Sequence, residues 1–419
     1  MIKTLKFGGT SVGSASNMRK VANIITTEKS TLTVLSAMSG TTDSLVRASD
    51  GSKREAEIAF LRNKYTECID ELLTNKQASF DKLEEVLFIV SSDTTTQSAR
   101  EAQGELLTTF IFTEYLRESG ENAKLIYAPD FMVTDDTCSV VHTKLNKLKE
   151  AIEPDTIYIT QGFIATIADG TLGNLGRGGS DYSAALMGVA IGSSEVQIWT
   201  DIDGMHTGDP RFVRGTRPIR RMSFDEAAEL AYFGAKILHP ATVIPCKEAG
   251  VDVRLKNTMD PSADGTLISS TDESAMNFHA IAAKDNITLI RISSARMLMA
   301  YGFLRKVFEV FEKYKTPIDM ITTSEVAVSL TVDHIDHLAE ITEELKEMAS
   351  VEVEHNNSIV CVVGRIDYDH AGLAARVFKA VENIPIKMIS YGASHRSMSL
   401  LINSQDKIPT LQSLNNFLF

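Results

Sequence analysis

Up to about residue 280 the chain alternates short apolar runs with helical segments, a pattern that few folds accommodate. The runs end in loops rich in Gly, Ser, Thr and Asp, and residues at helical spacing follow, such as Met18, Val21 and Ile25. This pattern predicts an α/β domain with a largely parallel sheet. Ligands of such sheets bind beyond the carboxyl ends of the strands, so we expect functional residues in those loops. The apolar runs that we interpret as strands are Leu32–Leu35, Val86–Val90, Ile157–Ile159 and Val196–Trp199.

The rest of the chain contains an internal repeat. Residues 262–277 are polar and lack periodicity, which indicates a linker. Beyond them, residues 302–308 match 372–378, and residues 317–321 match 385–389. Each helix-like piece is followed by a strand-like piece and an alternating run, which predicts two copies of a β-α-β-β unit. Duplicated units of this kind either bind effectors between the copies or serve the structure alone, and the repeat leaves both open.

Composition excludes several classes of protein. At 419 residues the chain exceeds what one core usually serves, so two or three domains are expected. Acidic residues outnumber basic ones by 55 to 42, and the net charge of −13 argues against a general binder of nucleic acid or anionic membranes. The four cysteines have no C-x-x-C spacing, which favours reduced thiols over a zinc site. We find neither a signal peptide nor an apolar stretch of roughly 20 residues, so a soluble cytoplasmic protein is expected.

A glycine-containing segment, Lys6-Phe7-Gly8-Gly9-Thr10-Ser11, lies between an expected strand and an expected helix. Glycines let backbone N–H groups approach a phosphate, and the start of a helix adds positive potential. Lys6 can place its charge on the β- and γ-phosphates of a nucleotide. The segment matches neither the Walker A loop nor G-x-G-x-x-G, and a plain tight turn also explains it.

A second loop, Gly173–Asp181, has four glycines within seven residues and precedes an expected helix. Such a loop can wrap around an anion. Arg177 can form a bidentate pair with a carboxylate, and Ser180 can donate from the start of the helix. Asp181 could orient Lys6 or a metal ion. The alternative is a flexible surface hairpin followed by a helix cap.

Two further segments suit a nucleotide. The acids of residues 200–204, with Asp209-Pro210-Arg211, suit ribose hydroxyls or a phosphate-bound Mg²⁺, although aspartates that form turns explain them too. A capping box at residues 223–226 begins a helix that reaches Lys236. Lys236 could contact a nucleotide or be an ordinary surface lysine.

Two smaller segments suit a polar substrate. The hydroxyl groups of residues 36–42 follow an expected strand and could hold such a molecule. Glu105 stands at the start of an apolar helix, where it could bind an ammonium group or cap the helix.

Taken together, these segments resemble the aspartate kinases of the amino-acid-kinase superfamily, and in particular their single-function, lysine-inhibited class. The resemblance covers nearly the whole chain and is carried by Lys6–Ser11, Gly104-Glu105, Gly176–Asp181, Thr200–Gly204, Phe233–Pro240 and Ile318–Glu325. It implies an αβα-sandwich catalytic domain over residues 1–278 and an α+β regulatory region over residues 279–419. That region would hold two interleaved ACT domains, one of roughly 294–356 and the other of 279–293 plus 357–419.

The resemblance also implies residue roles. The ATP contacts would be Lys6, Phe7, Gly8, Gly9, Thr200, Asp201, His206, Arg211, Lys236 and Ile237. The aspartate contacts would be Ser36, Thr42, Glu105, Arg177 and Ser180, and the catalytic pair would be Lys6 and Asp181, which positions it. The effector contacts would be Met297, Phe303, Ile318, Asp319, Thr323, Ser324 and Glu325. Two positions depart from the family: His206 stands where Tyr is usual, and Ala300 stands where similar lysine-sensing proteins have Ser.

The implied activity is ATP-dependent phosphorylation of the L-aspartate side chain to 4-phospho-L-aspartate, the first step toward lysine, threonine and methionine. Mg²⁺ would be carried with ATP, and no protein-bound metal site is expected. An aspartate side chain has a reference pKa of about 3.9, so it is already ionised at neutral pH and needs no strong base. Catalysis would rest on positioning and on charge neutralisation by Lys6, loop amides and Mg²⁺. Arg177 would take the α-carboxylate and Glu105 the α-ammonium.

The resemblance further implies inhibition by L-lysine and a homodimer or homotetramer formed through the ACT domains, with no nucleic-acid or membrane partner. One rival is a kinase of the same superfamily that acts on glutamate, carbamate or UMP, and the C-terminal repeat with residues 233–240 argues against it. The other rival is an inactive amino-acid sensor, against which Lys6, Arg177 and Asp181 argue together. At 419 residues, we expect no fused homoserine dehydrogenase.

Overall fold

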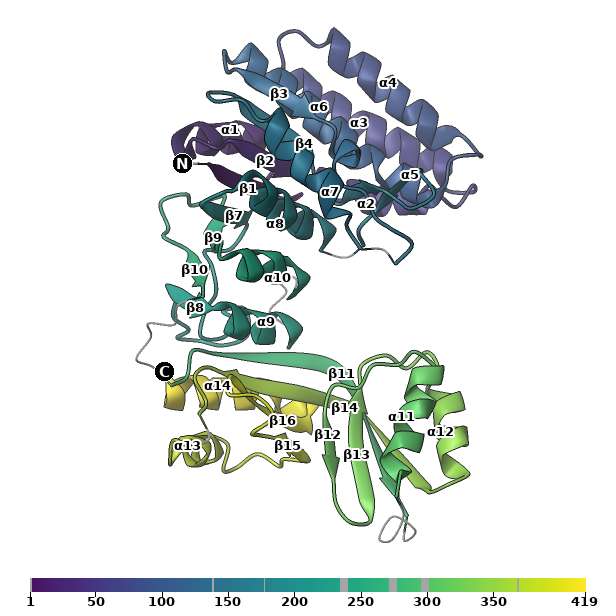
Figure 1. The fold of residues 1–419 in the computed structure, drawn as a ribbon, viewed down its shortest axis with the longest axis vertical. Coiled ribbons are helices and arrows are strands. Elements are labelled where there is room, and N and C mark those ends of the chain that lie inside the picture. Colours follow the sequence, from purple (N-terminus) through teal and green to yellow (C-terminus); the bar gives the residue numbers. More distant parts are fainter. Residues whose placement is uncertain are drawn as a thin grey trace. The chain divides into compact units, whose positions relative to one another are not determined.

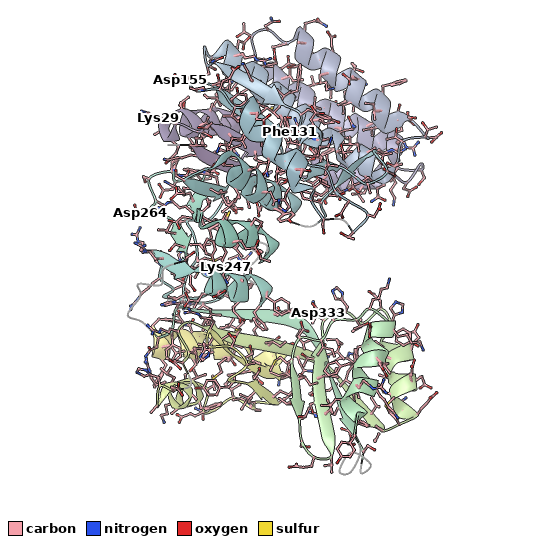
Figure 2. The ribbon with its side chains drawn as sticks, in the orientation of Figure 1. Lys29, Phe131, Asp155, Lys247, Asp264 and Asp333 are labelled. Atoms are coloured by element: carbon pink, nitrogen blue, oxygen red, sulfur yellow. The ribbon has the colours of Figure 1, made fainter. Side chains whose placement is uncertain are left out.

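The structure is a computed structural model that describes residues 2–137, 139–176, 178–233, 240–270, 277–294, 301–367 and 369–419. Figure 1 shows the ribbon, and Figure 2 adds the described side chains. Contacts divide the chain into two compact units. The first comprises Met1–Met205, Pro218–Ala227 and Ile237–Asp272; the second comprises His206–Arg217, Ala228–Lys236 and Glu273–Phe419. The boundary predicted at residue 278 differs from this division, because three segments before it, 206–217, 228–236 and 273–278, are grouped with the second unit.

The first unit is built on an eight-stranded sheet, which confirms the predicted α/β class. The strand order is β3-β4-β2-β1-β7-β9-β10-β8, and neighbours run parallel except for β9 and β10. The strands are β1 (Lys3–Phe7), β2 (Leu32–Leu35), β3 (Ala123–Ile126), β4 (Ile157–Gln161), β7 (Glu195–Thr200), β8 (Arg221–Ser223), β9 (Asp252–Asn257) and β10 (Thr266–Ser269).

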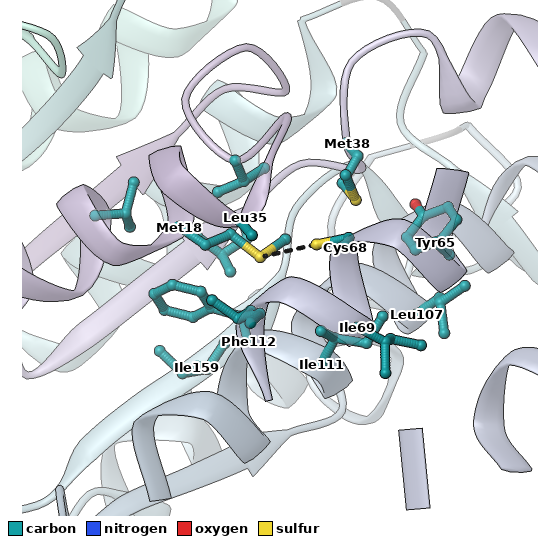
Figure 3. Packing of buried hydrophobic residues seen from close by; sticks show 14 of the residues in the cluster. Met18, Leu35, Met38, Tyr65, Cys68, Ile69, Leu107, Ile111, Phe112 and Ile159 are labelled. Atoms are coloured by element: carbon teal, nitrogen blue, oxygen red, sulfur yellow. Dashed lines mark hydrogen bonds between the residues drawn. The ribbon is translucent and has the colours of Figure 1, made fainter. Parts of the chain in front are cut away.

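Helices cover both faces of this sheet, and the residues of its central strands are buried on both faces. On β1, Leu5 and Phe7 point into a hydrophobic cluster shared with α1 (Ala15–Glu28), α3 (Arg54–Leu72), α4 (Gln77–Ser91) and α6 (Gln103–Glu118). Part of that cluster is shown in Figure 3. Thr4 points to the opposite face, toward Gly188 of α8 (Gly179–Ile191). The result is the predicted αβα sandwich.

One predicted strand is wrong. Residues 86–90 lie within α4, where Leu83, Val86, Leu87 and Val90 are buried at helical spacing. A run of five apolar residues does not distinguish a buried strand from a helix by periodicity alone.

The remaining elements of the first unit connect this framework. They are α2 (Thr41–Arg47), α5 (Gln97–Glu101), η1 (Ala128–Asp130), α7 (His142–Leu145), η2 (Asn146–Ala151), the β5–β6 pair (Ile164–Thr166 and Leu172–Asn174), α9 (Phe224–Tyr232) and α10 (Pro240–Ala249). Helix α9 begins in the first unit and ends in the second. Within the described ranges, no helix has the length and apolar character needed to cross a membrane.

The second unit contains a six-stranded antiparallel sheet, which confirms the predicted duplication. Its strand order is β12-β13-β11-β14-β16-β15. The elements are β11 (Ala280–Ser293), α11 (Phe303–Lys313), β12 (Ile321–Thr323), β13 (Ala327–Val332), α12 (Leu338–Lys346), β14 (Ser350–Val363), α13 (Leu373–Ala380), β15 (Met388–Ser390), β16 (Ser397–Asn403), η4 (Ser404–Asp406) and α14 (Lys407–Leu418).

The two long strands β11 and β14 are each shared by both copies. Ile290 and Ile292 of β11 lie in a core with α11 and α12, whereas Ile281 lies in a second core with α13 and α14. We predicted that residues 279–293 as a whole belong to the second copy. The structure instead divides β11 near its register shift between Lys284 and Ile287, because each half pairs with a different half of β14.

The segment 206–217 is tied into the second unit. The backbone N–H of Ile281 donates to the Thr207 carbonyl at 2.7 Å, and the Thr207 hydroxyl donates to Asn415 Oδ1 at 3.0 Å. Val213 adds its side chain to the core around α13 and α14. This segment contains two of the predicted ATP contacts, His206 and Arg211.

Candidate active site

A cavity of about 410 Å³ opens beyond the carboxyl ends of β1 and β2 in the first unit. This is where ligands of a parallel sheet are expected to bind. It brings together seven of the predicted site residues: Lys6, Gly9, Ser36, Thr42, Glu105, Ser180 and Asp181. Its lining also includes Ser39, Gly176, Gly178 and Gly179, which belong to loops that the sequence indicated. Five further lining residues had no predicted role, namely Ala37, Met38, Gly40, Asp43 and Phe163.

An ion pair in the cavity joins Lys6 to Asp181. Lys6 is near the end of β1, and Asp181 is in the first turn of α8, so two separate elements place them. Lys6 Nζ lies 2.5 Å from Asp181 Oδ1, and both side chains are largely buried. Gly178, the N-cap residue just before α8, has φ of 77°, in the left-handed conformation that glycine adopts most readily. The Asp181 carboxylate therefore holds the Lys6 ammonium near the carboxyl end of β1.

The two loops after β1 and β2 lie against each other. The Ser36 N–H donates to the Phe7 carbonyl at 3.1 Å, and the Ser39 N–H donates to the Gly9 carbonyl at 3.0 Å. A Cβ atom at Gly9 would lie 2.7 Å from the Ala37 carbonyl oxygen. Glycine is therefore required at position 9 for this close approach.

Glu105 is a buried acid of the cavity whose pKa is strongly raised. Gly104 lets α6 approach the loop, because a Cβ there would meet the Ala37 methyl at 2.8 Å. The Ala37 N–H donates to Glu105 Oε1 at 3.1 Å, while Oε2 is buried and has no hydrogen-bond partner among the described residues. Burial raises the pKa of Glu105 to about 8, although the Ala37 N–H and the Lys6 ammonium act in the opposite direction. Burial favours the neutral form of such a carboxyl group, and a cation bound beside it would favour the ionised form.

Supporting contacts come from residues that the sequence did not indicate. The Thr108 hydroxyl accepts from the Met38 N–H at 3.1 Å and contacts the Tyr65 hydroxyl at 3.0 Å. Tyr65 also contacts the Thr41 hydroxyl at 3.1 Å, and Lys64 Nζ donates to the Ser39 carbonyl at 2.5 Å. These groups on α3 and α6 hold the loop of residues 36–42. No local motif marks them, because their partners are distant in the sequence.

The other predicted nucleotide contacts that the structure describes do not line the cavity. Phe7 is fully buried and stacks on Trp199, with ring centroids 5.7 Å apart, so it supports β1 from within the core. At the end of β7, the Thr200 hydroxyl donates to Asp201 Oδ1 at 3.0 Å. His206 and Arg211 belong to the second unit. Gly8 is adjacent to Lys6, since a Cβ there would lie 3.7 Å from its ammonium. Arg177, Lys236 and Ile237 lie outside the described residues.

The predicted effector residues lie in the first copy of the duplicated unit. Phe303 and Ile318 pack against its core, and Thr323, Ser324 and Glu325 are exposed at and beyond the end of β12. Asp319 is different, because its side chain is buried against Lys284 and Tyr232, neither of which the sequence indicated. Met297 and Ala300 lie outside the described residues.

The charges of the cavity limit what it can bind. Its described lining carries one cation, Lys6, and three acids, Asp43, Glu105 and Asp181. Lys6 is engaged by Asp181, and among the described residues Glu105 Oε2 has no hydrogen-bond partner. Glycine loops and hydroxyl groups surround these charges. The arrangement suits a small ligand that brings its own ammonium group alongside anionic groups.

Comparison with known proteins agrees with this geometry. The model of the amino acid kinase family matches residues 1–257, and an ACT domain model matches residues 360–417. The chain belongs to the amino acid kinase family.

More closely, the chain is an aspartokinase. It is 35% identical over 442 aligned residues to lysine-sensitive aspartokinase 3 of Escherichia coli K12, covering 99% of this chain and 98% of that one. The crystal structure of E. coli aspartokinase III with aspartate and ADP, in the R-state, matches at a TM-score of 0.87 and 34% identity, with full coverage of both chains. The complex of that enzyme with lysine and aspartate, in the T-state, matches at a TM-score of 0.83, covering 100% of this chain and 99% of that one.

Proposed function

We propose that this aspartokinase transfers the γ-phosphoryl group of MgATP to the side-chain carboxylate of L-aspartate in the cavity beyond β1 and β2. The observation that carries the proposal is the Lys6–Asp181 pair, which lies at the cavity with the glycine loop on one side and Glu105 on another. Membership of the family and the similarity to an enzyme crystallised with aspartate and ADP support it.

The cavity provides opposite charges for the two ends of aspartate. Glu105 would accept the α-ammonium group, which supplies the missing partner of its buried Oε2. Ser36, Thr42 and Ser180 line the same cavity and would donate to carboxylate oxygens. Arg177, just before α8, would pair with the α-carboxylate in a bidentate manner. The side-chain carboxylate is then left to face the γ-phosphate.

Phosphoryl transfer to a carboxylate does not require the enzyme to remove a proton from the nucleophile. The nucleophile is ionised at neutral pH, because its reference pKa is about 3.9. The difficulty is holding one anion against another. Lys6 would neutralise charge on the transferred group, and Asp181 would keep its ammonium in place.

The nucleotide would bind as MgATP, with Mg²⁺ as part of the substrate. In the part of the chain that the structure describes, no group of three His, Cys, Asp or Glu side chains could hold a metal ion. The phosphates would lie along Lys6, Gly8 and Gly9. Thr200, Asp201, His206, Arg211, Lys236 and Ile237 complete the proposed nucleotide set.

L-Lysine is the proposed inhibitor, acting through the first ACT unit. The support is that the E. coli relative is lysine-sensitive and was crystallised with lysine. Asp319 would receive the side-chain ammonium, with Met297, Phe303, Ile318, Thr323, Ser324 and Glu325 around the rest of the ligand. Assembly through the ACT domains, as a homodimer or homotetramer, and a cytoplasmic location are part of the same proposal.

The experiment that tests the function measures ADP release with a panel of acceptors: L-aspartate, L-glutamate, carbamate and UMP. The proposal expects turnover with L-aspartate only. Turnover with another acceptor instead would assign the chain to a different kinase activity, and no turnover with any acceptor would favour an inactive sensor.

The regulatory part needs its own test. Asp319→Asn keeps the shape of the side chain but removes its charge, so inhibition by L-lysine should be lost while the enzyme still phosphorylates aspartate. Competitive inhibition against aspartate that Asp319→Asn does not change would move the lysine site out of the ACT unit. Inhibition by threonine but not by lysine would change the effector, with Ala300 the position to examine first.

A further inference from the structure

Asp319, whose carboxylate is proposed to bind the ammonium group of the effector, already contacts two side chains of the same chain. Lys284 Nζ lies 2.6 Å from Asp319 Oδ1, and the Tyr232 hydroxyl donates to the same oxygen at 2.9 Å. The Asp319 side chain is only 1% exposed, and its other oxygen, Oδ2, is buried without a hydrogen-bond partner in the described part of the chain. A buried acceptor of this kind is destabilising, so the site favours a further donor.

Backbone geometry fixes both members of this pair. Lys284 is the last residue of β11 before the register shift, beside Asn286 with φ of 61°. The Asp319 N–H donates to the Thr331 carbonyl at 2.9 Å, which anchors it beside β13. The pair therefore joins one half of β11 to the start of β12.

The charges around Lys284 do not balance. Its ammonium also lies 2.8 Å from Asp333 Oδ2, just beyond β13, and 4.5 Å from the centroid of the Tyr232 ring. Asp333 is labelled in Figure 2. Burial, together with Asp319, raises the pKa of Tyr232 to about 12, so its hydroxyl stays neutral. Two carboxylates face one ammonium, so these three groups carry a formal charge of −1, with His334 Nε2 3.7 Å from Asp333 Oδ1.

The second copy of the repeat shows the same contact with the charges reversed. Lys387 occupies the position in the repeat that Asp319 occupies in the first copy. Its ammonium is paired with Glu354 of β14 and lies 2.6 Å from Asn357 Oδ1. Because Lys387 replaces Asp319, the second copy has no carboxylate at the position that is proposed to bind the effector in the first copy. It therefore provides a matched control for the first pair.

We propose that Lys284 is a built-in competitor of the effector: its ammonium occupies the Asp319 carboxylate that the ammonium of L-lysine would use, and so sets the concentration at which L-lysine binds. The inference rests on the proposed lysine site. Because Lys284 is tethered, it competes at a high effective concentration. L-Lysine gains entry because the cluster retains a negative charge and an unsatisfied acceptor, Asp319 Oδ2.

The shared oxygen gives this competition a consequence. Tyr232 is the last residue of α9, four residues before Lys236, which belongs to the proposed nucleotide set. Any rearrangement at Asp319 Oδ1 alters the hydrogen bond that holds Tyr232. If the effector replaces Lys284 at Asp319, the position of Tyr232 at the end of α9 would therefore change.

The test is calorimetric titration of L-lysine into the full-length chain. Lys284→Met removes the competing ammonium and should tighten binding about tenfold, which corresponds to about 1.4 kcal/mol. Asp333→Asn leaves Asp319 as the sole acid facing Lys284 and should weaken binding several-fold. Lys387→Met breaks the equivalent contact of the second copy and should leave the affinity for L-lysine unchanged. Thermal unfolding of each variant checks that the fold is kept.

The outcomes separate this inference from the proposed regulation. Weaker or unchanged binding in folded Lys284→Met would overturn it, because Lys284 would then only support the site. If Lys284→Met does not fold, Asp333→Asn decides instead. Several-fold weaker binding of L-lysine supports the inference, and unchanged or tighter binding overturns it. If the wild-type chain phosphorylates aspartate but does not bind L-lysine, its proposed regulation fails. Binding by Lys284→Met alone would then support a competitor that blocks the site fully, and binding by neither would overturn it.

Discussion

Lys6 Nζ lies 2.5 Å from Asp181 Oδ1, so a single ion pair joins the end of β1 to the first turn of α8. Both side chains are largely buried, and the low local dielectric makes the position of the ammonium costly to change. A pair of this kind holds a positive charge in place before the substrates arrive. Such preorganisation is what charge stabilisation in phosphoryl transfer requires.

Removing the ammonium should affect the chemical step. Lys6→Ala should lower kcat by about 100-fold or more, because the lost charge acts mainly on the transition state. The control is Lys3→Ala on the same strand. Lys3 does not line the cavity, and its Nζ lies 2.7 Å from Glu28 Oε2. Steady-state kinetics of both variants check the prediction. Near-normal turnover in Lys6→Ala would remove Lys6 from the mechanism.

Arg177 should matter through its planar geometry. Arg177→Lys keeps the charge but cannot pair with a carboxylate in a bidentate manner, so KM for aspartate should rise strongly while KM for ATP changes little. Initial rates with each substrate varied in turn provide the measurement. A rise in KM for ATP instead would assign this loop to the nucleotide.

The raised pKa of Glu105 should make aspartate binding depend on pH, through the proposed contact with the α-ammonium group. An ammonium group binds the ionised carboxylate, and Glu105 without ligand is protonated below about pH 8. Affinity for aspartate should therefore increase as the pH rises from 6 to about 8 and then level off. Glu105→Gln should bind weakly without this dependence. Calorimetric titration across this range checks both expectations, and a flat profile in the wild-type chain would contradict the assignment.

The same shift has a consequence for stability. The pKa of Glu105 is raised from an ordinary value of 4.5 to about 8, so between these values the folded chain binds more protons than the unfolded chain. The free energy of unfolding without ligand should therefore fall, through this group, as the pH rises through that window. Glu105→Gln should remove that part of the dependence, which denaturant titrations at several pH values would detect.

Close packing at Gly104 should be essential to the substrate site. In Gly104→Ala the new methyl would lie 2.8 Å from the Ala37 Cβ and 2.9 Å from Thr41 Cγ2, so α6 and the loop must separate. We expect a loss of about 1–3 kcal/mol in stability and a higher KM for aspartate. Gly51→Ala is the control, since a Cβ there meets nothing within 4 Å. Equal effects of the two substitutions on KM would show that the approach of α6 is unimportant.

Local motifs made much of this site predictable from the sequence. Lys6, Gly9, Ser180 and Asp181 all belong to loops that follow strands, and a parallel sheet brings such loops to one edge. The internal repeat likewise predicted the duplicated second unit. Residues 86–90 were assigned wrongly because a short apolar run fits a strand as well as a buried helix.

Contacts between distant segments were not predictable in this way. Tyr65 and Thr108 support the loop of residues 36–42 from separate helices, and no spacing in the sequence links them to it. Lys284 meets Asp319 only because a register shift in β11 and the start of β12 bring them together. The segment 206–217 follows a strand of the first unit yet packs with the second, which its composition does not indicate.

The most direct test of the central claim is trapping of the acyl phosphate with hydroxylamine. A chain that phosphorylates the aspartate side chain should form aspartyl hydroxamate in proportion to the ADP released, and only when both ATP and L-aspartate are present. Lys6→Ala should form about 100-fold less under the same conditions. ADP release that L-aspartate does not stimulate, or that yields no hydroxamate, would contradict the account.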